Sequence, residues 1–195
     1  WEAYGCLEGG AARAIGLVAT TKEWLDLRNR CFVLLGGSSA LSPLSLLLQC
    51  GATVIAIGRR KPAVWAKLIS QAKSSAGTLV FPCADPLAGG ESDAQLADKA
   101  GADLLTQAPE IGAWLQQAVP SVGLPTTVGM YTYLDSDAHV RVSLACDMVT
   151  RPLLALSGVT ISLAYLQTPS IPYIIGEEIH SAEQTRHATS WLRTL

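Results

Sequence analysis

Residues 31–60 have the sequence CFVLLGGSSALSPLSLLLQCGATVIAIGRR, and this stretch decides the fold. It holds two short apolar runs, 31–35 and 53–57, which contain no charged residue. Such runs are typical of strands in a parallel sheet that helices cover on both faces. Between them we predict a loop rich in glycine and serine, followed by a short helix over 43–50. The stretch is therefore predicted to form a strand–loop–helix–strand unit.

The rest of the chain continues this alternation of strands and helices. Further strands are predicted over 78–82, 126–130 and 159–166, and further helices over 62–74, 92–100, 109–118 and 137–154. Parallel neighbours need long crossovers, so the alternation predicts parallel pairing. The predicted fold class is α/β, a three-layer Rossmann-like parallel sheet with helices on both faces. We expect this nucleotide-binding domain to span 31–176, between an N-terminal helical extension (1–30) and a C-terminal helix (177–195).

Composition and charge limit the class of protein. The 195 residues are 49% hydrophobic and 15% charged, which suits a single domain with a sizeable core. The formal net charge of −2 leaves no basic field that would attract nucleic acid. The five cysteines form no CxxC pair and no Cys/His cluster, so we expect neither disulfides nor a metal site. This favours an intracellular reducing compartment, either the cytosol or an organelle matrix (mitochondrion or plastid).

One uncharged segment, 31–58, is long enough to span a membrane. Its glycines and Pro43 instead favour buried strands joined by turns. We therefore predict that the chain is not an integral membrane protein. The sequence begins at Trp1 rather than at Met, so we expect a processed protein or a fragment.

The loop GGSS (36–39) after the first strand has the composition of a phosphate-binding loop. Glycines permit a tight turn and close backbone approach, and the serines add hydroxyl donors before a helix N-terminus. Arg59 and Arg60 follow the second strand, beginning 23 residues after the first glycine. An acidic residue there would bind a ribose 2′-hydroxyl, whereas arginine favours a 2′-phosphate. The sequence therefore predicts an NADP(H) site; the alternative is that both arginines lie in a solvated turn.

Residues 31–60 resemble the opening of the short-chain dehydrogenases/reductases, whose loop has the pattern TGxxxGxG. Gly36 matches the first glycine of that pattern, while Ala40 and Ser42 stand in place of the second and third. A Cβ at either of these two positions narrows the approach of a cofactor to the backbone.

The resemblance extends more weakly over residues 31–166. Asp85 resembles the adenine-contacting aspartate of that family, and 140–165 resemble its later helix and fifth strand. Together, the loop and the resemblance imply that the dinucleotide-binding residues are Gly36, Gly37, Ser38, Ser39, Leu41, Arg59, Arg60 and Asp85.

The sequence lacks the catalytic residues that are typical of that family. Its members use an Asn, a Ser and a Tyr-xxx-Lys pair, in which the lysine lowers the pKa of the tyrosine. Here no tyrosine is followed by lysine four residues later, and the last lysine is Lys99. The Asn position corresponds to Ser143, and the Ser position falls near Ala164 or Tyr165. The candidate catalytic residues for any activity are Tyr165, Tyr133 and Ser143.

Three functional hypotheses remain open. The first is an NADP(H)-binding protein without the usual catalytic residues, which acts as a structural or regulatory subunit of a larger assembly. Other protein subunits would then dock on its terminal helices, and its NADP(H) binding is either retained or lost. The second is an active NADP-dependent reductase or epimerase with non-standard acid and base residues. The third is an enzyme for a nucleotide sugar or another phosphate-bearing ligand, which shares only the loop.

Overall fold

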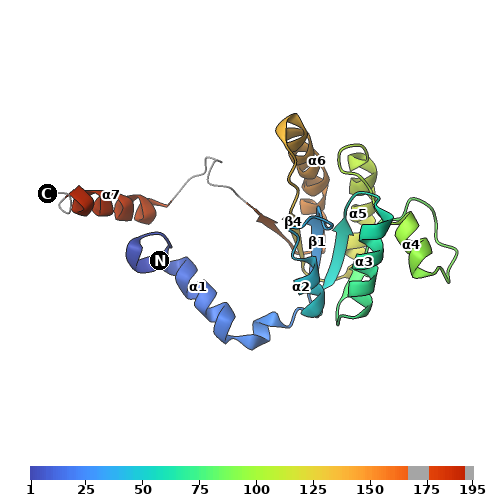
Figure 1. The fold of residues 1–195 in the computed structure, drawn as a ribbon, viewed down its shortest axis with the longest axis horizontal. Coiled ribbons are helices and arrows are strands. Elements are labelled where there is room, and N and C mark those ends of the chain that lie inside the picture. The colour runs from blue at the N-terminus through green and yellow to red at the C-terminus, as the bar shows by residue number, and fades with distance from the viewer. Residues whose placement is uncertain (167–175, 192–195) are drawn as a thin grey trace. The chain divides into compact units, whose positions relative to one another are not determined.

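A computed structural model describes residues 1–166 and 176–191 (Figure 1). The described residues form two compact units, one of residues 26–166 and the other of residues 1–25 with 176–191. The predicted domain over 31–176 and the predicted C-terminal helix also include 167–175 and 192–195, which lie outside the described residues.

The larger unit contains a sheet of five parallel strands in the order β3-β2-β1-β4-β5. The strands are β1 (Cys31–Leu35), β2 (Thr53–Ile57), β3 (Thr78–Val80), β4 (Thr126–Met130) and β5 (Ile161–Tyr165). The central strand is β1, whose Leu35 pairs with Ile57 of β2 on one side and with Met130 of β4 on the other. The parallel pairing confirms the predicted α/β fold class.

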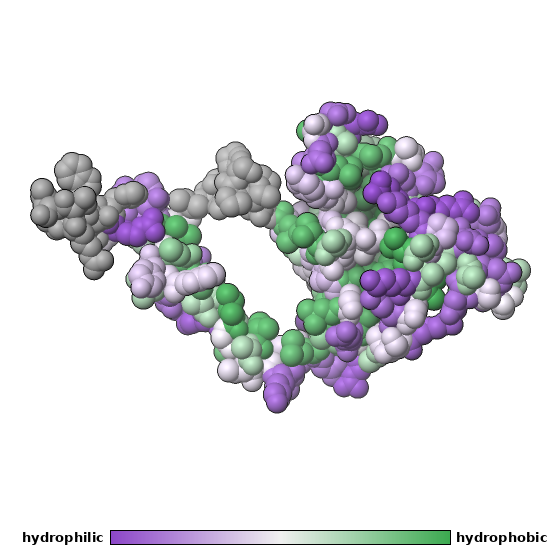
Figure 2. Space-filling view, viewed as in Figure 1, coloured by the Kyte–Doolittle hydropathy of each residue, from purple (hydrophilic) through white to green (hydrophobic). Residues whose placement is uncertain are grey.

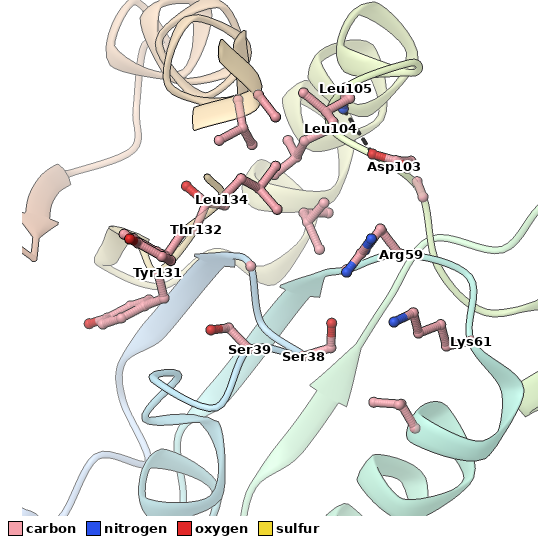
Figure 3. Close-up of a pocket in the computed structure, with 18 residues that line it drawn as sticks. Ser38, Ser39, Arg59, Lys61, Asp103, Leu104, Leu105, Tyr131, Thr132 and Leu134 are labelled. Atoms are coloured by element: carbon pink, nitrogen blue, oxygen red, sulfur yellow. Dashed lines mark hydrogen bonds between the residues drawn. The ribbon is translucent and has the colours of Figure 1, made fainter. Parts of the chain in front are cut away.

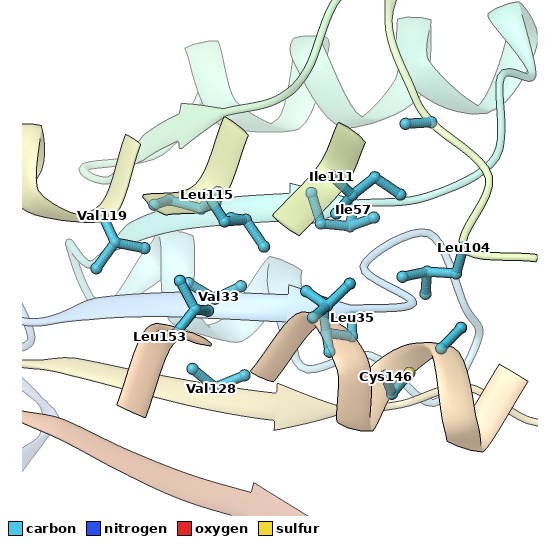
Figure 4. Packing of buried hydrophobic residues seen from close by; sticks show 14 of the residues in the cluster. Val33, Leu35, Ile57, Leu104, Ile111, Leu115, Val119, Val128, Cys146 and Leu153 are labelled. Atoms are coloured by element: carbon cyan, nitrogen blue, oxygen red, sulfur yellow. The ribbon is translucent and has the colours of Figure 1, made fainter. Parts of the chain in front are cut away.

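Helices cover both faces of the sheet. They are α2 (Leu44–Gln49), α3 (Pro62–Lys73), α4 (Asp93–Lys99), α5 (Ala108–Val122) and α6 (Ser136–Leu154). Figure 4 shows Leu115 of α5 and Leu153 of α6 packed with Val33 and Val128 of the sheet. The opposite face is covered by α2 and α3, with α4 packed against α3, around the fully buried Trp65. Burial of each large apolar side chain stabilises the folded state by about 1.5–3 kcal/mol. Burial on both faces of the sheet therefore stabilises the three-layer arrangement.

Several elements differ in length from the prediction. The strand predicted over 159–166 is shorter at both ends, as β5 (Ile161–Tyr165). The helix predicted to end at 118 continues through Pro120 to Val122, because the buried Val119 packs in the core and outweighs the backbone hydrogen bond that proline removes. The strand β3 has three residues instead of the predicted five. The helix predicted over 43–50 is shorter by one residue at each end.

The smaller unit holds the two terminal helices. Its elements are the 3-10 helices η1 (Glu2–Tyr4) and η2 (Lys22–Leu25) and the α-helices α1 (Gly9–Thr20) and α7 (Glu177–Trp191). No side chain of α1 is buried, and Ile15, Leu17 and Val18 bring apolar groups to its surface (Figure 2). Among the described residues, no helix combines the length and the apolar character that a membrane span needs.

The turn after β1 requires glycine at its first position. The φ angle of Gly36 is +86°, in the left-handed region that disfavours other residues. A Cβ at this position would lie only 2.8 Å from the carbonyl oxygen of Tyr131. The N–H of Tyr131 donates to the Leu35 carbonyl at 2.8 Å, which keeps the end of β4 against the turn.

We expect Gly36→Ala to lower the free energy of unfolding by more than Gly90→Ala does. Both glycines have similar φ angles, +86° and +84°, so both variants lose about 1–2 kcal/mol of backbone preference. A Cβ at Gly90 would meet no described atom within 4 Å. The difference between the two variants in free energy of unfolding, measured by urea denaturation, therefore gives the cost of the contact with Tyr131. Equal losses in the two variants would show that the turn relaxes and avoids this contact.

Candidate functional site

A cavity of about 350 Å³ opens at the carboxyl ends of β1, β2 and β4 (Figure 3). The chain moves from β1 to β2 on one side and later reaches β4 on the other side of β1. In open parallel sheets, ligands bind in the crevice at such a switch point. The cavity therefore has the position at which a Rossmann-type domain holds its ligand.

One side of the cavity carries two cations and two hydroxyl groups. Ser38 and Ser39 come from the loop after β1, while Arg59 and Lys61 come from the loop after β2 (Figure 3). Within the part of the chain that the structure describes, neither cation forms an ion pair. Two unpaired positive charges beside hydroxyl donors favour an anionic ligand such as a phosphate.

The opposite side of the cavity is apolar. Leu104 and Leu105 come from the segment between α4 and α5, and Leu134 comes from the segment after β4 (Figure 3). Asp103 fixes the turn of the first segment, because its carboxylate accepts the Leu105 N–H at 2.9 Å and its own N–H donates to Gln107 at 3.0 Å. The cavity is thus cationic on one side and apolar on the other, with one carboxylate near the leucines.

The segment that forms the apolar side, 102–105, is attached to the end of β2. The Ala102 N–H donates to the Gly58 carbonyl at 2.9 Å. Gly101, with φ +107°, passes so close to Trp65 that a Cβ would lie 2.6 Å from the indole nitrogen. In the sequence, Gly101 indicates a turn but does not indicate that the next segment crosses the end of β2.

The glycine pair shapes the turn but does not offer its N–H groups to a ligand. The Gly36 N–H donates to the Ile57 carbonyl at 3.0 Å, and the Gly37 N–H donates to the same oxygen at 2.8 Å and to Leu34 at 3.1 Å. A Cβ at Gly37 would lie 2.9 Å from the Cβ of Ala56, so this glycine permits close packing on β2. Of the pair, only Gly36 lines the cavity.

The side chains of Arg59 and Arg60, both predicted to bind the dinucleotide, point in different directions. The Arg59 side chain faces the cavity, and its carbonyl accepts the indole N–H of the buried Trp65 at 3.0 Å (Figure 3). The Arg60 Nε donates instead to the carbonyl of Asp98, at the end of α4, at 2.9 Å. Arg60 does not line the cavity, so of the two only Arg59 is placed to contact a ligand there.

Leu41 and Asp85 also do not line the cavity. Leu41 is 58% exposed. Asp85 is exposed in a loop that Glu91 organises, because the Glu91 carboxylate accepts the Ala88 N–H at 2.7 Å, and this bond lowers the pKa of Glu91. The acidic residue that does line the cavity is Asp103.

Of the three candidate catalytic residues, only Tyr133 lines the cavity. This residue is 65% exposed, and its ring lies beside that of His139, with ring centroids 5.6 Å apart. The Ser143 hydroxyl donates to the His139 carbonyl at 2.8 Å, within α6. Tyr165 ends β5, and its pKa is raised by burial and by the charge of Asp147. A raised pKa disfavours the phenolate, so Tyr165 is not activated as a base near neutral pH.

Sequence reasoning assigned no role to several lining residues, namely Lys61, Asp103, Leu104, Leu105, Thr132 and Leu134. Lys61 has a signal, because it extends the basic pair after β2. The leucines have none, since an apolar residue in an irregular segment looks the same in sequence whether it lines a cavity or fills the core.

The described residues include no group of three or more His, Cys, Asp or Glu side chains placed to hold a metal ion. Comparisons with protein-family models, with curated proteins and with solved structures find no match to this chain.

We expect Trp65→Phe to lower the free energy of unfolding by about 1–3 kcal/mol, because the Arg59 carbonyl would lose its donor. Trp114→Phe is the matched control, since that half-buried indole packs on the core and donates no hydrogen bond to a described residue. Urea denaturation of both variants measures the difference. A loss as large in the control would mean that ring volume, not the hydrogen bond to Arg59, stabilises this loop.

Proposed function

We propose that the chain is a degenerate, short-chain-dehydrogenase-like protein that binds NADP(H) without catalysing hydride transfer. The observation that carries the proposal is the Arg59 side chain, which faces the cavity at the carboxyl end of β2. In Rossmann domains an arginine near this position accommodates the 2′-phosphate of NADP. Lys61 and Ser38 lie on the same side of the cavity and add a second charge and a hydroxyl donor.

The acid–base residues of the cavity support binding rather than turnover. Tyr133 lines the cavity, but the chain has no lysine after Lys99 that would lower the pKa of a tyrosine in a Tyr-xxx-Lys pair. A binding subunit of a larger assembly needs no such pair. In this proposal, other protein subunits dock on the terminal helices, where Ile15 and Leu17 of α1 are exposed.

One observation favours an active reductase or epimerase as the second candidate. Tyr133 places a phenol in the cavity wall, next to the imidazole of His139. A positioned phenol can donate or accept a proton in carbonyl chemistry. This candidate predicts turnover that depends on the Tyr133 hydroxyl.

The binding proposal predicts that Arg59→Ala weakens NADPH binding by about 10- to 100-fold, the range for losing hydrogen bonds to a charged group. Arg60→Ala removes the same charge from the neighbouring residue, whose side chain bonds the Asp98 carbonyl, and should change the dissociation constant less than about twofold. Fluorescence enhancement of NADPH measures both variants, with NADH as the comparison ligand. NADH should bind wild type about as weakly as NADPH binds Arg59→Ala.

Two results would contradict this proposal. One is the absence of saturable NADPH binding to the wild-type protein. The other is an equal loss in Arg59→Ala and Arg60→Ala, which would indicate attraction by net charge rather than a site.

The catalytic question is tested by following NADPH absorbance with a panel of aldehydes and ketones. We expect no oxidation of NADPH above the rate without protein. Turnover that Tyr133→Phe abolishes, while Tyr165→Phe leaves it intact, would replace the binding proposal by the reductase.

A further inference from the structure

The cavity covers only part of the region that a whole dinucleotide needs. Dinucleotide sites consist of two mononucleotide-binding halves, and the ligand spans the crevice between them. Here the lining comes from the loops after β1 and β2 and from the segment before α5. Of the second half, the described residues that line the cavity are 131–134 and two residues in the first turns of α6, and none of them belongs to β5.

Most backbone N–H groups of the loop after β1 donate hydrogen bonds to acceptors within the protein. Besides the glycine pair, the Ser39 N–H donates to the Gly36 carbonyl at 2.8 Å, and the Ser42 N–H donates to Ser39 at 3.1 Å. The Leu41 N–H donates to the Ser39 hydroxyl at 3.3 Å. A pyrophosphate is normally held by free N–H groups of this loop and by the helix that follows. Most of those donors are already used here, and α2 has only six residues.

The charges of the cavity orient a ligand that has one phosphate and one base. Arg59 and Lys61 attract the phosphate to their side. Asp103 repels it, and the second oxygen of this carboxylate accepts no hydrogen bond from a described residue, so it can accept an exocyclic amino group. Leu104 and Leu105 beside it offer the apolar surface that a purine ring needs.

The volume of the cavity suits a ligand with one base and one phosphate. At about 350 Å³ the cavity is near the lower end of the range for small-molecule sites, roughly 300–1,000 Å³. An adenosine with a ribose phosphate is about half of NADP(H), and its base and phosphate match the two sides of the cavity.

We infer that the cavity recognises only the adenosine 2′-phosphate half of NADP(H), and that the nicotinamide half adds no affinity. The inference rests on the proposed function and narrows it. A dehydrogenase must hold the nicotinamide ring against its substrate. A protein that holds only the other half senses or stores the phosphorylated cofactor and leaves its redox end outside the site.

Isothermal titration calorimetry of the wild-type chain with four ligands tests this inference. We expect 2′,5′-ADP and NADPH to bind with dissociation constants within about threefold of each other. ADP, which lacks the 2′-phosphate, should bind at least about tenfold more weakly. Reduced nicotinamide mononucleotide should not bind. Arg59→Ala should weaken 2′,5′-ADP and NADPH by the same factor, whereas Arg60→Ala should leave both unchanged.

The possible failures are distinguishable. If NADPH binds more than about tenfold tighter than 2′,5′-ADP, or if the nicotinamide mononucleotide binds, the half-site inference is overturned and the proposed NADP(H) site stands. If neither NADPH nor 2′,5′-ADP binds, the proposed function is overturned, and this inference falls with it.

Discussion

The carbonyl oxygen of Ile57 accepts two hydrogen bonds, at 3.0 Å from the Gly36 N–H and at 2.8 Å from the Gly37 N–H, and the site depends on this junction. It ties the turn after β1 to the last residue of β2. Because the turn is held there, Ser38 lies against Gly58, where a Cβ would come within 2.5 Å of the serine hydroxyl. The hydroxyl and cationic groups of one cavity wall therefore come from two strand ends that are fixed to each other, although α2 separates them in the sequence.

Cationic side chains and tyrosines line the cavity together. Its cations, Arg59 and Lys61, suit an anionic phosphate. Tyr131 and Tyr133 both line the cavity, and Tyr133 is largely exposed. Tyr165 lies at the end of the edge strand with a raised pKa. Catalysis of carbonyl reduction needs an activated proton donor, whereas binding needs only a fixed charge and a fitting shape. Arg59 and Lys61 place such charges in the cavity wall.

Much of the architecture could be predicted from the sequence, because apolar runs bounded by turn residues specify buried strands locally. The bounds of β1, β2 and β4 agree with the prediction for that reason. The site was less predictable, because its composition is set by contacts between distant segments. Arg59 and Arg60 are neighbours in the chain, and only the carbonyl of Asp98, 38 residues further on, draws the second one away. Asp103 enters the cavity because its segment crosses the end of β2, whereas Asp85 lies in a loop folded around Glu91. Similarly, glycine content predicts a turn but not which carbonyl its N–H groups meet.

The strand order has a consequence for how the chain folds. Leu35 pairs with Ile57, 22 residues later, and with Met130, 95 residues later. Closing the longer loop costs about 1.3 kcal/mol more in chain entropy. The three strands from β1 to β3 can therefore pair before β4 joins the sheet. During synthesis these strands also leave the ribosome first. The cavity exists only after β4 has docked, so a ligand that fills it binds late in assembly and slows unfolding more than it accelerates folding.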